Sequence, residues 1–251
     1  MKWEHKCSLD WLRARQRYLT ASDIKALLPI TKTGRPRKVT DQDRLRILAN
    51  KQVILTEEDC WSSGAAARGH ILEPFAVREF NEYAKYYYNE EYYWWDDKLV
   101  SCPDRCIAFS PDTMDVPMDD LDAADNVKQI LEVKSYNPER FLLTASMDKE
   151  DLEERWQIAT AMALLPNISG ATLELYNPSM RSGQIRWFRF SRLELVKEIE
   201  MILKVESDWK DFCGYSDLAL GIFKDSYTEE TELSESQIIE AIQERQKLNP
   251  I

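Results

Sequence analysis

The chain has 251 residues, which suits one large domain or two small ones with a sizeable core. Its formal charge of −11 argues, as an average, against avid binding to nucleic acids or anionic membranes, because both need many Lys and Arg residues. With 44% hydrophobic and 31% charged residues, and no apolar run of the roughly 20 residues that span a bilayer, the composition is that of an ordinary globular protein.

The N-terminus and the cysteines indicate a reducing compartment. Residues 1–10 are charged and lack the apolar stretch of a secretory signal. The five cysteines are an odd, scattered set, and only Cys102 and Cys106 are close together, with no second Cys or His pair to complete a metal site. We therefore expect a cytoplasmic protein with reduced thiols and no iron-sulfur cluster.

The charge is distributed unevenly along the chain. Residues 1–51 contain 13 Lys or Arg and 5 Asp or Glu, a charge of +8, and the remaining 200 residues carry −19. Within this basic part, Lys32 and Arg35 lie in a segment with Gly34 and Pro36 that predicts a loop. The N-terminal part, residues 1–51, is therefore the candidate binding site for a polyanion.

The expected elements alternate between helices and strands. In chain order they are a helix capped by Thr20 and ended by Pro29, a long amphipathic helix over residues 65–88, strands near residues 92–95, 100, 106–109 and 129–133, a helix over 152–165, strands over 171–176 and 185–190, a helix over 193–212, and a short helix over 236–248. This order predicts an α/β or α+β fold with a central mixed β-sheet flanked by helices. We expect one domain over residues 1–226, with 1–51 as its basic part, and an acidic peripheral tail over 227–251.

Carboxylates and a lysine are the strongest chemical signal. Glu132 and Lys134 are two residues apart on a predicted strand, so both point to the same face of the sheet. Asp112 follows another apolar strand, and an acidic insert over residues 112–125 separates the two strands. If these strands pair, Asp112 comes close to Glu132, and two carboxylates with a backbone carbonyl form the oxygen-rich kind of site that Mg²⁺ takes. Lys134 would then orient or deprotonate a metal-bound water.

The alternative is a salt bridge on a solvated sheet, because an acid and a lysine at this spacing often occur by chance. Ile130, Leu131 and Val133 instead favour a strand well inside the sheet. Burying an acid and a lysine there is costly unless they pair or bind a metal, which favours the metal-site interpretation.

Several short motifs, each weak alone, occur in an order that resembles a known family. Pro111-Asp112 and Glu132-Val133-Lys134 resemble the two halves of the PD-(D/E)xK nuclease signature. The full set resembles the phage lambda exonuclease and YqaJ-like viral recombinase family, and its other members are Trp11, Arg15, Thr20-Ala21-Ser22, Gly69-His70-Ile71-Leu72-Glu73, Trp156-Gln157-Ile158 and Tyr176-Asn177-Pro178. The resemblance covers most of the chain, residues 11–190, and implies a restriction-endonuclease-like core.

The resemblance implies a metal centre. Asp112, Glu132 and the backbone carbonyl of Val133 would bind catalytic Mg²⁺, for which Mn²⁺ can substitute, and Glu73 would serve a second metal or its waters. Lys134 would activate the attacking water. The further catalytic residue that the resemblance implies is Gln157, which would hold the lysine or the water in place.

The resemblance also implies a binding site for a DNA end. Arg15 and Ser22 look like the pair that grips a terminal 5′-phosphate. This agrees with their chemistry, because Arg binds phosphate through two hydrogen bonds and Ser22 lies at an expected helix N-terminus, a natural anion site. Lys32 and Arg35 are further candidates for contacts to DNA.

The resemblance implies a Mg²⁺-dependent 5′-to-3′ exodeoxyribonuclease that degrades one strand of linear double-stranded DNA and leaves 3′ single strands for homologous recombination. It further implies a ring-shaped homo-oligomer, with a trimer favoured, a single-strand annealing protein as partner, and a phage or prophage origin in the cytoplasm of a bacterial host. No membrane contact is expected, because of the charge and the lack of a long apolar run. The alternatives are a restriction or repair endonuclease on the same fold and a catalytically inactive DNA-binding recombination subunit. His70 and the acidic insert have no role in the resemblance, and the family's second Gln is replaced by Ala159.

Overall fold

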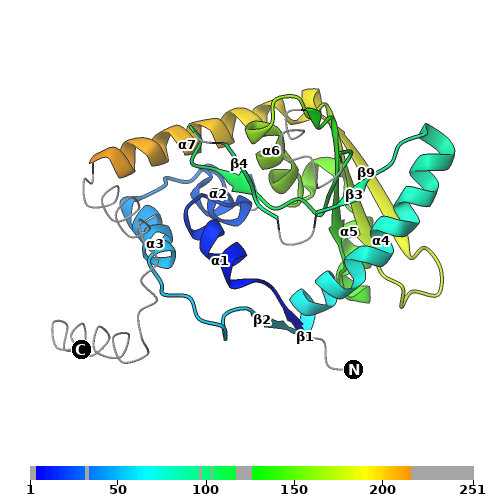
Figure 1. Ribbon diagram of the computed structural model, residues 1–251. Coiled ribbons are helices and arrows are strands. Elements are labelled where there is room, and N and C mark those ends of the chain that lie inside the picture. The colour runs from blue at the N-terminus through cyan, green and yellow to red at the C-terminus, as the bar shows by residue number, and fades with distance from the viewer. Residues whose placement is uncertain (1–3, 32–33, 96–97, 103, 117–125, 216–251) are drawn as a thin grey trace. The chain divides into compact units, whose positions relative to one another are not determined.

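Figure 1 shows a computed structural model of the chain, of which we describe residues 4–31, 34–95, 98–102, 104–116 and 126–215. The chain divides into two compact units, Met1–Lys210 and Asp211–Ile251, and all the elements below except the end of the last helix belong to the first unit. The helix expected over residues 236–248 lies outside the described residues. Within the described ranges, no helix is both long and apolar enough to cross a membrane.

A five-stranded mixed sheet forms the centre of the first unit. Its strands, in spatial order, are β3 (Tyr93–Trp94), β6 (Thr113–Met114), β7 (Gln129–Lys134), β8 (Gly170–Tyr176) and β9 (Ile185–Ser191). β7 and β8 are parallel, with Gln129 opposite Gly170 and Lys134 opposite Leu175, and the other neighbours are antiparallel. The expected α/β fold with a mixed central sheet is confirmed.

Helix α4 (Gly64–Tyr88) covers one face of this sheet (Figure 1). Its buried side chains, which include Leu72, Ala76 and Phe80, pack with Leu131 and Val133 of β7 in one apolar cluster. Asn89 ends the helix in the left-handed conformation, with φ 55°. The helix expected over residues 65–88 is therefore confirmed to within one residue.

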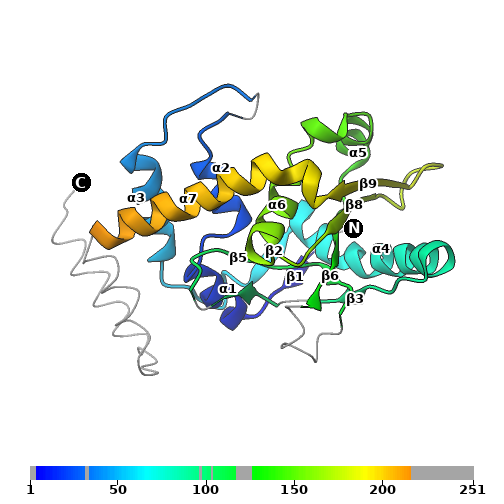
Figure 2. The ribbon, with the colours of Figure 1, turned by 90° about the horizontal axis from the view of Figure 1, so that it is seen from above.

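The crossover from β7 to β8 places a helix on the opposite face. It runs through α5 (Pro138–Ala145), the 3₁₀ turn η2 (Lys149–Asp151) and α6 (Arg155–Leu164) (Figure 2). The predicted start of α6 at residue 152 is wrong, because Leu152 has an extended backbone and is buried in the core rather than on a helix face. After β9, the 3₁₀ turn η3 (Arg192–Leu195) leads into α7 (Val196–Tyr215).

One predicted strand pairing is also wrong. The strand β5 (Ala108–Phe109), which precedes Asp112, pairs with β4 (Val100–Ser101) in a separate two-stranded sheet. Pro111 has no N–H to donate, and the chain resumes pairing only at β6, inside the expected acidic insert. Asp112 therefore stands at the start of the strand that pairs with β7, and not at the end of one; residues 117–125 of the insert lie outside the described residues.

The N-terminal part packs beside these sheets. Its elements are β1 (Glu4–Lys6), which pairs with β2 (Trp61–Ser63), and the helices α1 (Leu9–Gln16), α2 (Ala21–Leu27) and α3 (Asp41–Lys51). Between α1 and α2, Leu19 forms a bridge with Ile107: its N–H donates to the Cys106 carbonyl (2.7 Å), and its own carbonyl accepts from Ala108 (3.0 Å). The basic part of the chain is thereby attached to the strand that leads to Asp112.

Candidate active site

The carboxylate of Glu132 is the centre of the site. Glu132 is only 4% exposed, although it is an acid, and it points away from the α4 face because its neighbours Leu131 and Val133 occupy that face. Lys134 donates a hydrogen bond to Glu132 Oε1, and Gln157 Nε2 of α6 donates to the same oxygen (2.5 Å). The two catalytic side chains expected beside Glu132 are thus brought to one of its oxygens.

Asp112 lies beside this pair. Because Thr113 is opposite Leu131, the next position places Asp112 opposite Glu132. Asp112 Oδ2 accepts a hydrogen bond from the backbone N–H of Val133 (2.7 Å), and Lys134 Nζ also donates to the Val133 carbonyl (3.3 Å). The predicted approach of Asp112 to Glu132 occurs, through β6 rather than through the preceding strand.

Glu73 approaches from α4. Its side chain is 17% exposed, and His70 Nδ1 lies 3.5 Å from Glu73 Oε2 one turn earlier on the helix. Glu73 is close enough to Asp112 for its charge to raise the pKa of that carboxyl group. His70 therefore contacts the outermost of the three acids and contributes to the same cluster.

The electrostatics of the cluster indicate an excess of negative charge. Burial raises the pKa of Asp112 well above its usual value, and the charges of Glu132 and Glu73 raise it further. Burial also raises the pKa of Glu132, Lys134 opposes this, and the charge of Glu73 adds to the rise. Burial alone would lower the pKa of Lys134, but the charges of Glu132 and Asp112 raise it above its usual value. Three acids thus share one lysine.

This charge balance suits a divalent cation, which stabilises several carboxylates at one place and takes oxygen ligands. Asp112, Glu132, Glu73 and the Val133 carbonyl, the ligands that the resemblance implies, lie in this part of the structure. Among the described residues, no group of three His, Cys, Asp or Glu side chains is already arranged as a metal cage. The metal site therefore stays a prediction.

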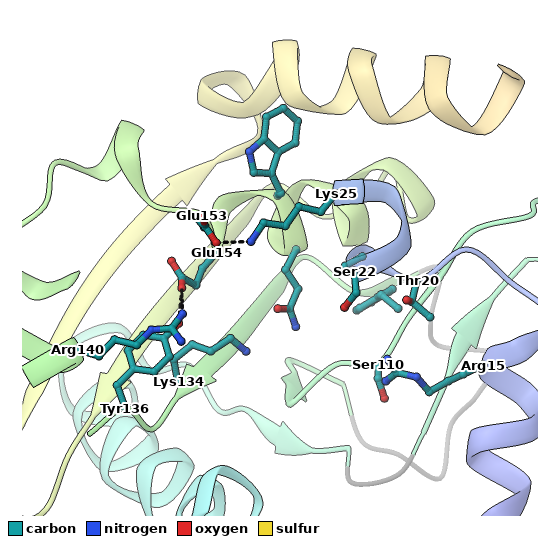
Figure 3. A pocket seen from close by; sticks show the side chains of 14 residues that line it. Arg15, Thr20, Ser22, Lys25, Ser110, Lys134, Tyr136, Arg140, Glu153 and Glu154 are labelled. Atoms are coloured by element: carbon teal, nitrogen blue, oxygen red, sulfur yellow. Dashed lines mark hydrogen bonds and ion pairs between the residues drawn. The ribbon is translucent and has the colours of Figure 1, made fainter. Parts of the chain in front are cut away.

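A cavity of about 230 Å³ adjoins the cluster (Figure 3). Arg15 from α1 and Ser22 from the first turn of α2 lie on one side, and Lys134 lies on the other. Gln157 also lines this cavity. The structure therefore brings the two predicted 5′-phosphate ligands to the same cavity as two predicted catalytic residues.

Arg15 is held in the cavity wall by its neighbours. Its guanidinium carbon lies 4.4 Å from the centre of the Trp11 ring, and Trp11 Nε1 donates to Ser110 Oγ (3.1 Å), two residues before Asp112. Burial lowers the pKa of Arg15, an effect that the charge of Asp23 opposes. Trp11 thus connects Arg15 to the chain segment that carries Asp112.

One of the two remaining predicted DNA contacts, Arg35, does not line this cavity. Arg35 is exposed in the loop after α2, its N–H donates to Thr31 Oγ1 (3.1 Å), and it is not among the residues that line the cavity. Lys32 lies outside the described residues. Their contacts to DNA stay predictions.

The chain matches a known protein family over more than half of its length. Residues 10–171 match the model of the YqaJ-like viral recombinase domain. The chain belongs to this family. Every residue that we predicted for the site, from Arg15 to Gln157, lies within the matched range, and the resemblance found from the sequence motifs is confirmed.

Solved structures agree with the fold of this YqaJ-like domain. An alkaline exonuclease from Laribacter hongkongensis matches with a TM-score of 0.57 and 18% sequence identity, over 85% of this chain and 98% of that chain. The same exonuclease in complex with dAMP matches with a TM-score of 0.52 and 16% identity, over 83% and 98%. No curated protein sequence matches the chain.

Several residues that line the cavity of the YqaJ-like domain were not predicted from the sequence. Tyr136 donates from its hydroxyl to Glu154, and Arg140 stacks over the Tyr136 ring, with 4.0 Å from the guanidinium carbon to the ring centre. On the other side, Lys25 Nζ of α2 forms an ion pair with Glu153 (2.5 Å). The Asn137-Pro138 helix start could have indicated that α5 follows Lys134 at once, which places Arg140 beside the site.

The Tyr176-Asn177-Pro178 motif, which lies beyond the matched range, has a structural role. Asn177 is fully buried, and its amide nitrogen donates to the Tyr136 carbonyl (3.0 Å). Arg68 of α4 donates to the same carbonyl (2.6 Å) and to the Asn177 side-chain oxygen (3.0 Å). These hydrogen bonds fix the backbone at Tyr136, two residues after Lys134.

Proposed function

We propose that this YqaJ-like domain is a Mg²⁺-dependent exodeoxyribonuclease that degrades linear duplex DNA in the 5′-to-3′ direction from 5′-phosphorylated ends and leaves 3′ single strands for recombination. One observation carries the proposal. The cavity lined by Arg15 and Ser22 is also lined by Lys134 and Gln157, the two side chains that hold Glu132. The match to an alkaline exonuclease in fold supports the same class of reaction.

Asp112, Glu132, the Val133 carbonyl and Glu73 would hold the metal. When bound there, Mg²⁺ would lower the pKa of a bound water and offset the negative charge that develops on the phosphate. Lys134, which donates to the Glu132 carboxylate, would orient that water. Gln157 fixes the rotamer of Glu132 through its hydrogen bond, so that the carboxylate is held ready for its ligand.

Arg15 and Ser22 would bind the terminal 5′-phosphate. A terminal phosphate carries close to two negative charges, and a partly buried guanidinium and a helix N-terminal turn are favourable partners for it. With the 5′ end held in a cavity whose wall includes Lys134, the reacting phosphodiester lies near the end of the strand. This placement favours an exonuclease over an endonuclease on the same fold.

The test compares linear duplexes with 5′-phosphate and 5′-hydroxyl ends in the presence of Mg²⁺. The wild type should degrade the 5′-phosphorylated duplex faster, and Lys134→Ala should lower that rate by about a hundredfold or more. Lys128→Ala, an exposed lysine just before the same strand, is the matched control and should leave the rate unchanged. Equal rates for wild type and Lys134→Ala would refute the assignment of the site.

Three further measurements separate the alternatives. An exonuclease should leave a covalently closed circular plasmid intact and consume it after linearisation, whereas nicking of the circle would indicate an endonuclease. Binding of DNA ends without degradation in Mg²⁺ or Mn²⁺ would indicate an inactive recombination subunit. Chelation with EDTA should abolish degradation, and added Mg²⁺ or Mn²⁺ should restore it.

The assembly is part of the same proposal. A ring-shaped homo-oligomer, with three copies favoured, would encircle the duplex, and a single-strand annealing protein would receive the 3′ strand in the cytoplasm of a phage-infected or prophage-carrying bacterium. The viral recombinase description of the family supports this setting. Light scattering of the purified protein would test the oligomer, and a monomer at working concentrations would refute it.

A further inference from the structure

Lys51 is a buried lysine that the sequence analysis did not single out. It is the last residue of α3, and its side chain is only 8% exposed. Its Nζ forms an ion pair with Asp23 Oδ2 (2.6 Å) and also donates to the backbone carbonyl of Arg15 (3.3 Å). One ammonium group from α3 therefore contacts both helices that carry the proposed phosphate ligands.

Asp23 holds the start of α2. The oxygen that accepts from Lys51 also accepts from the backbone N–H of Thr20 (2.8 Å) and from its hydroxyl (2.8 Å), which closes the capping box of the helix. Ser22 lies between these two residues, in the first turn. Any movement of the Asp23 carboxylate would therefore move the backbone that places the Ser22 hydroxyl.

On the other side, Lys51 reaches the last turn of α1. The Arg15 carbonyl belongs to that turn, where a cation is favourable because the helix leaves carbonyl groups without intrahelical donors. Burial lowers the pKa of Lys51, and the Arg15 charge adds to this effect, while Asp23 opposes it. Lys51 thus stays buried next to another cation because Asp23 and the carbonyl stabilise it.

The arrangement leaves Arg15 available for a ligand. Among the described residues, the ion pairs include Asp23 with Lys51, and none includes the Arg15 guanidinium, which contacts the Trp11 ring instead. Arg15 and Lys51, with Asp23 as the one acid between them, leave a surplus positive charge, and of the three only Arg15 lines the cavity. A phosphate group would balance it.

We propose that Lys51 is a positioning residue for recognition of the 5′-phosphate, because it fixes the backbone of Arg15 relative to that of Ser22. The inference rests on the proposed function. Lys51 itself does not reach the cavity, of which it is not a lining residue. It acts through Asp23 and through the Arg15 carbonyl.

The experiment measures kcat and KM on linear duplexes with 5′-phosphate and 5′-hydroxyl ends, for wild type and Lys51→Met, which removes the charge and keeps most of the volume. The ratio of kcat/KM between the two ends should fall by about tenfold to a hundredfold, the size expected for a misplaced charge-assisted hydrogen bond. The loss should appear mainly as a higher KM for the phosphorylated end. Lys51→Arg, which keeps the charge, should restore most of the ratio.

Arg192→Met is the control for simple destabilisation. Arg192 donates to the carbonyls of Met162, Leu165 and Ile168 at the end of α6, so its loss should lower the unfolding temperature without changing the end preference. Asp23→Asn should lower the ratio as Lys51→Met does, and the double variant should lower it no further. This second single variant keeps the inference testable if Lys51→Met fails to fold.

The outcomes separate this inference from the proposed function. An unchanged ratio in Lys51→Met or in Asp23→Asn, with a wild type that prefers phosphorylated ends, refutes the role of Lys51 alone. A wild type that degrades both ends equally refutes the phosphate site, and the role of Lys51 with it. Binding of the two duplexes in EDTA, measured by fluorescence anisotropy, should show the same loss of preference without any hydrolysis.

Discussion

Glu174 is a buried acid whose protonation should make the stability of the protein depend on pH. It is 0% exposed in the middle of β8, on the face covered by α4, because it lies opposite Val133 on one side and Trp187 on the other. Among the described residues, neither of its carboxylate oxygens has a hydrogen-bond partner. Burial raises the pKa of Glu174 to about 9; the nearby Trp187 indole opposes this shift, and the charge of Glu79 adds to it.

The raised pKa of Glu174 sets both the direction and the size of the change in unfolding free energy with pH. The folded state keeps Glu174 protonated up to a pH of about 9, whereas the unfolded chain ionises near 4.5, so folding becomes less favourable as the pH rises between these values. Each pH unit in this window lowers the free energy of unfolding by about 1.4 kcal/mol, which amounts to about 3 kcal/mol at pH 7. This is a large share of the roughly 5–15 kcal/mol that is usual for a domain.

Glu174→Gln removes the ionisation and keeps the shape. We expect the variant to exceed the wild type in unfolding free energy by about 3 kcal/mol at pH 7 and by about 1 kcal/mol or less at pH 5. Urea unfolding followed by tryptophan fluorescence from pH 5 to pH 8 measures the difference. Glu200→Gln, at an exposed position of α7, is the matched control and should give a curve parallel to that of the wild type. A parallel curve for Glu174→Gln as well would refute the reasoning.

Three other substitutions test the site and its supports. Gln157→Leu should lower degradation of 5′-phosphorylated duplex by about tenfold to a hundredfold with little change in unfolding temperature, and an unchanged rate would contradict its role. Asn177→Ala should lower the unfolding free energy in urea by about 2 kcal/mol, because the carbonyl of Tyr136 loses one of its two donors; a loss within about 0.5 kcal/mol would count against this. Arg105→Met should cost about 3 kcal/mol by the same assay, because Glu206 would lose the three hydrogen bonds from that side chain and stay buried beside Lys210, whose Nζ lies 3.5 Å from Oε1; stability equal to that of the wild type would disprove this.

Long elements with a clear period could be predicted from the sequence. The apolar positions of α4 recur at helical spacing over the whole helix, and β8 and β9 are continuous or alternating apolar runs. β6 could not be predicted, because Thr113-Met114 is only two residues long and lies among acidic residues. Its position is set by pairing with β7, a tertiary contact that local sequence does not encode.

The site was predictable where each side chain has its own chemical signal. Glu132 and Lys134 share a face because of strand geometry alone, and an acid and a lysine on a buried strand need a reason to be there. Lys51 gave no signal, because a lysine at the end of a polar helix is common and only the fold buries it. Glu153 and Glu154 were likewise ordinary acids of the sequence until α2 and α5 placed cations opposite them.

The net charge of −11 describes the chain as a whole and not this cavity. Four cations line it, of which Lys25 is paired with Glu153, Arg140 lies 3.8 Å from Glu154, and Lys134 is bound to Glu132. Within the described part of the chain, Arg15 is the lining cation that has no ion pair. An anion that enters the cavity can therefore gain most at Arg15 without first displacing a carboxylate. The acids that make the average charge negative thus also favour Arg15 as the binding site for the anion, because Glu153, Glu154 and Glu132 already pair with the other three cations of the cavity.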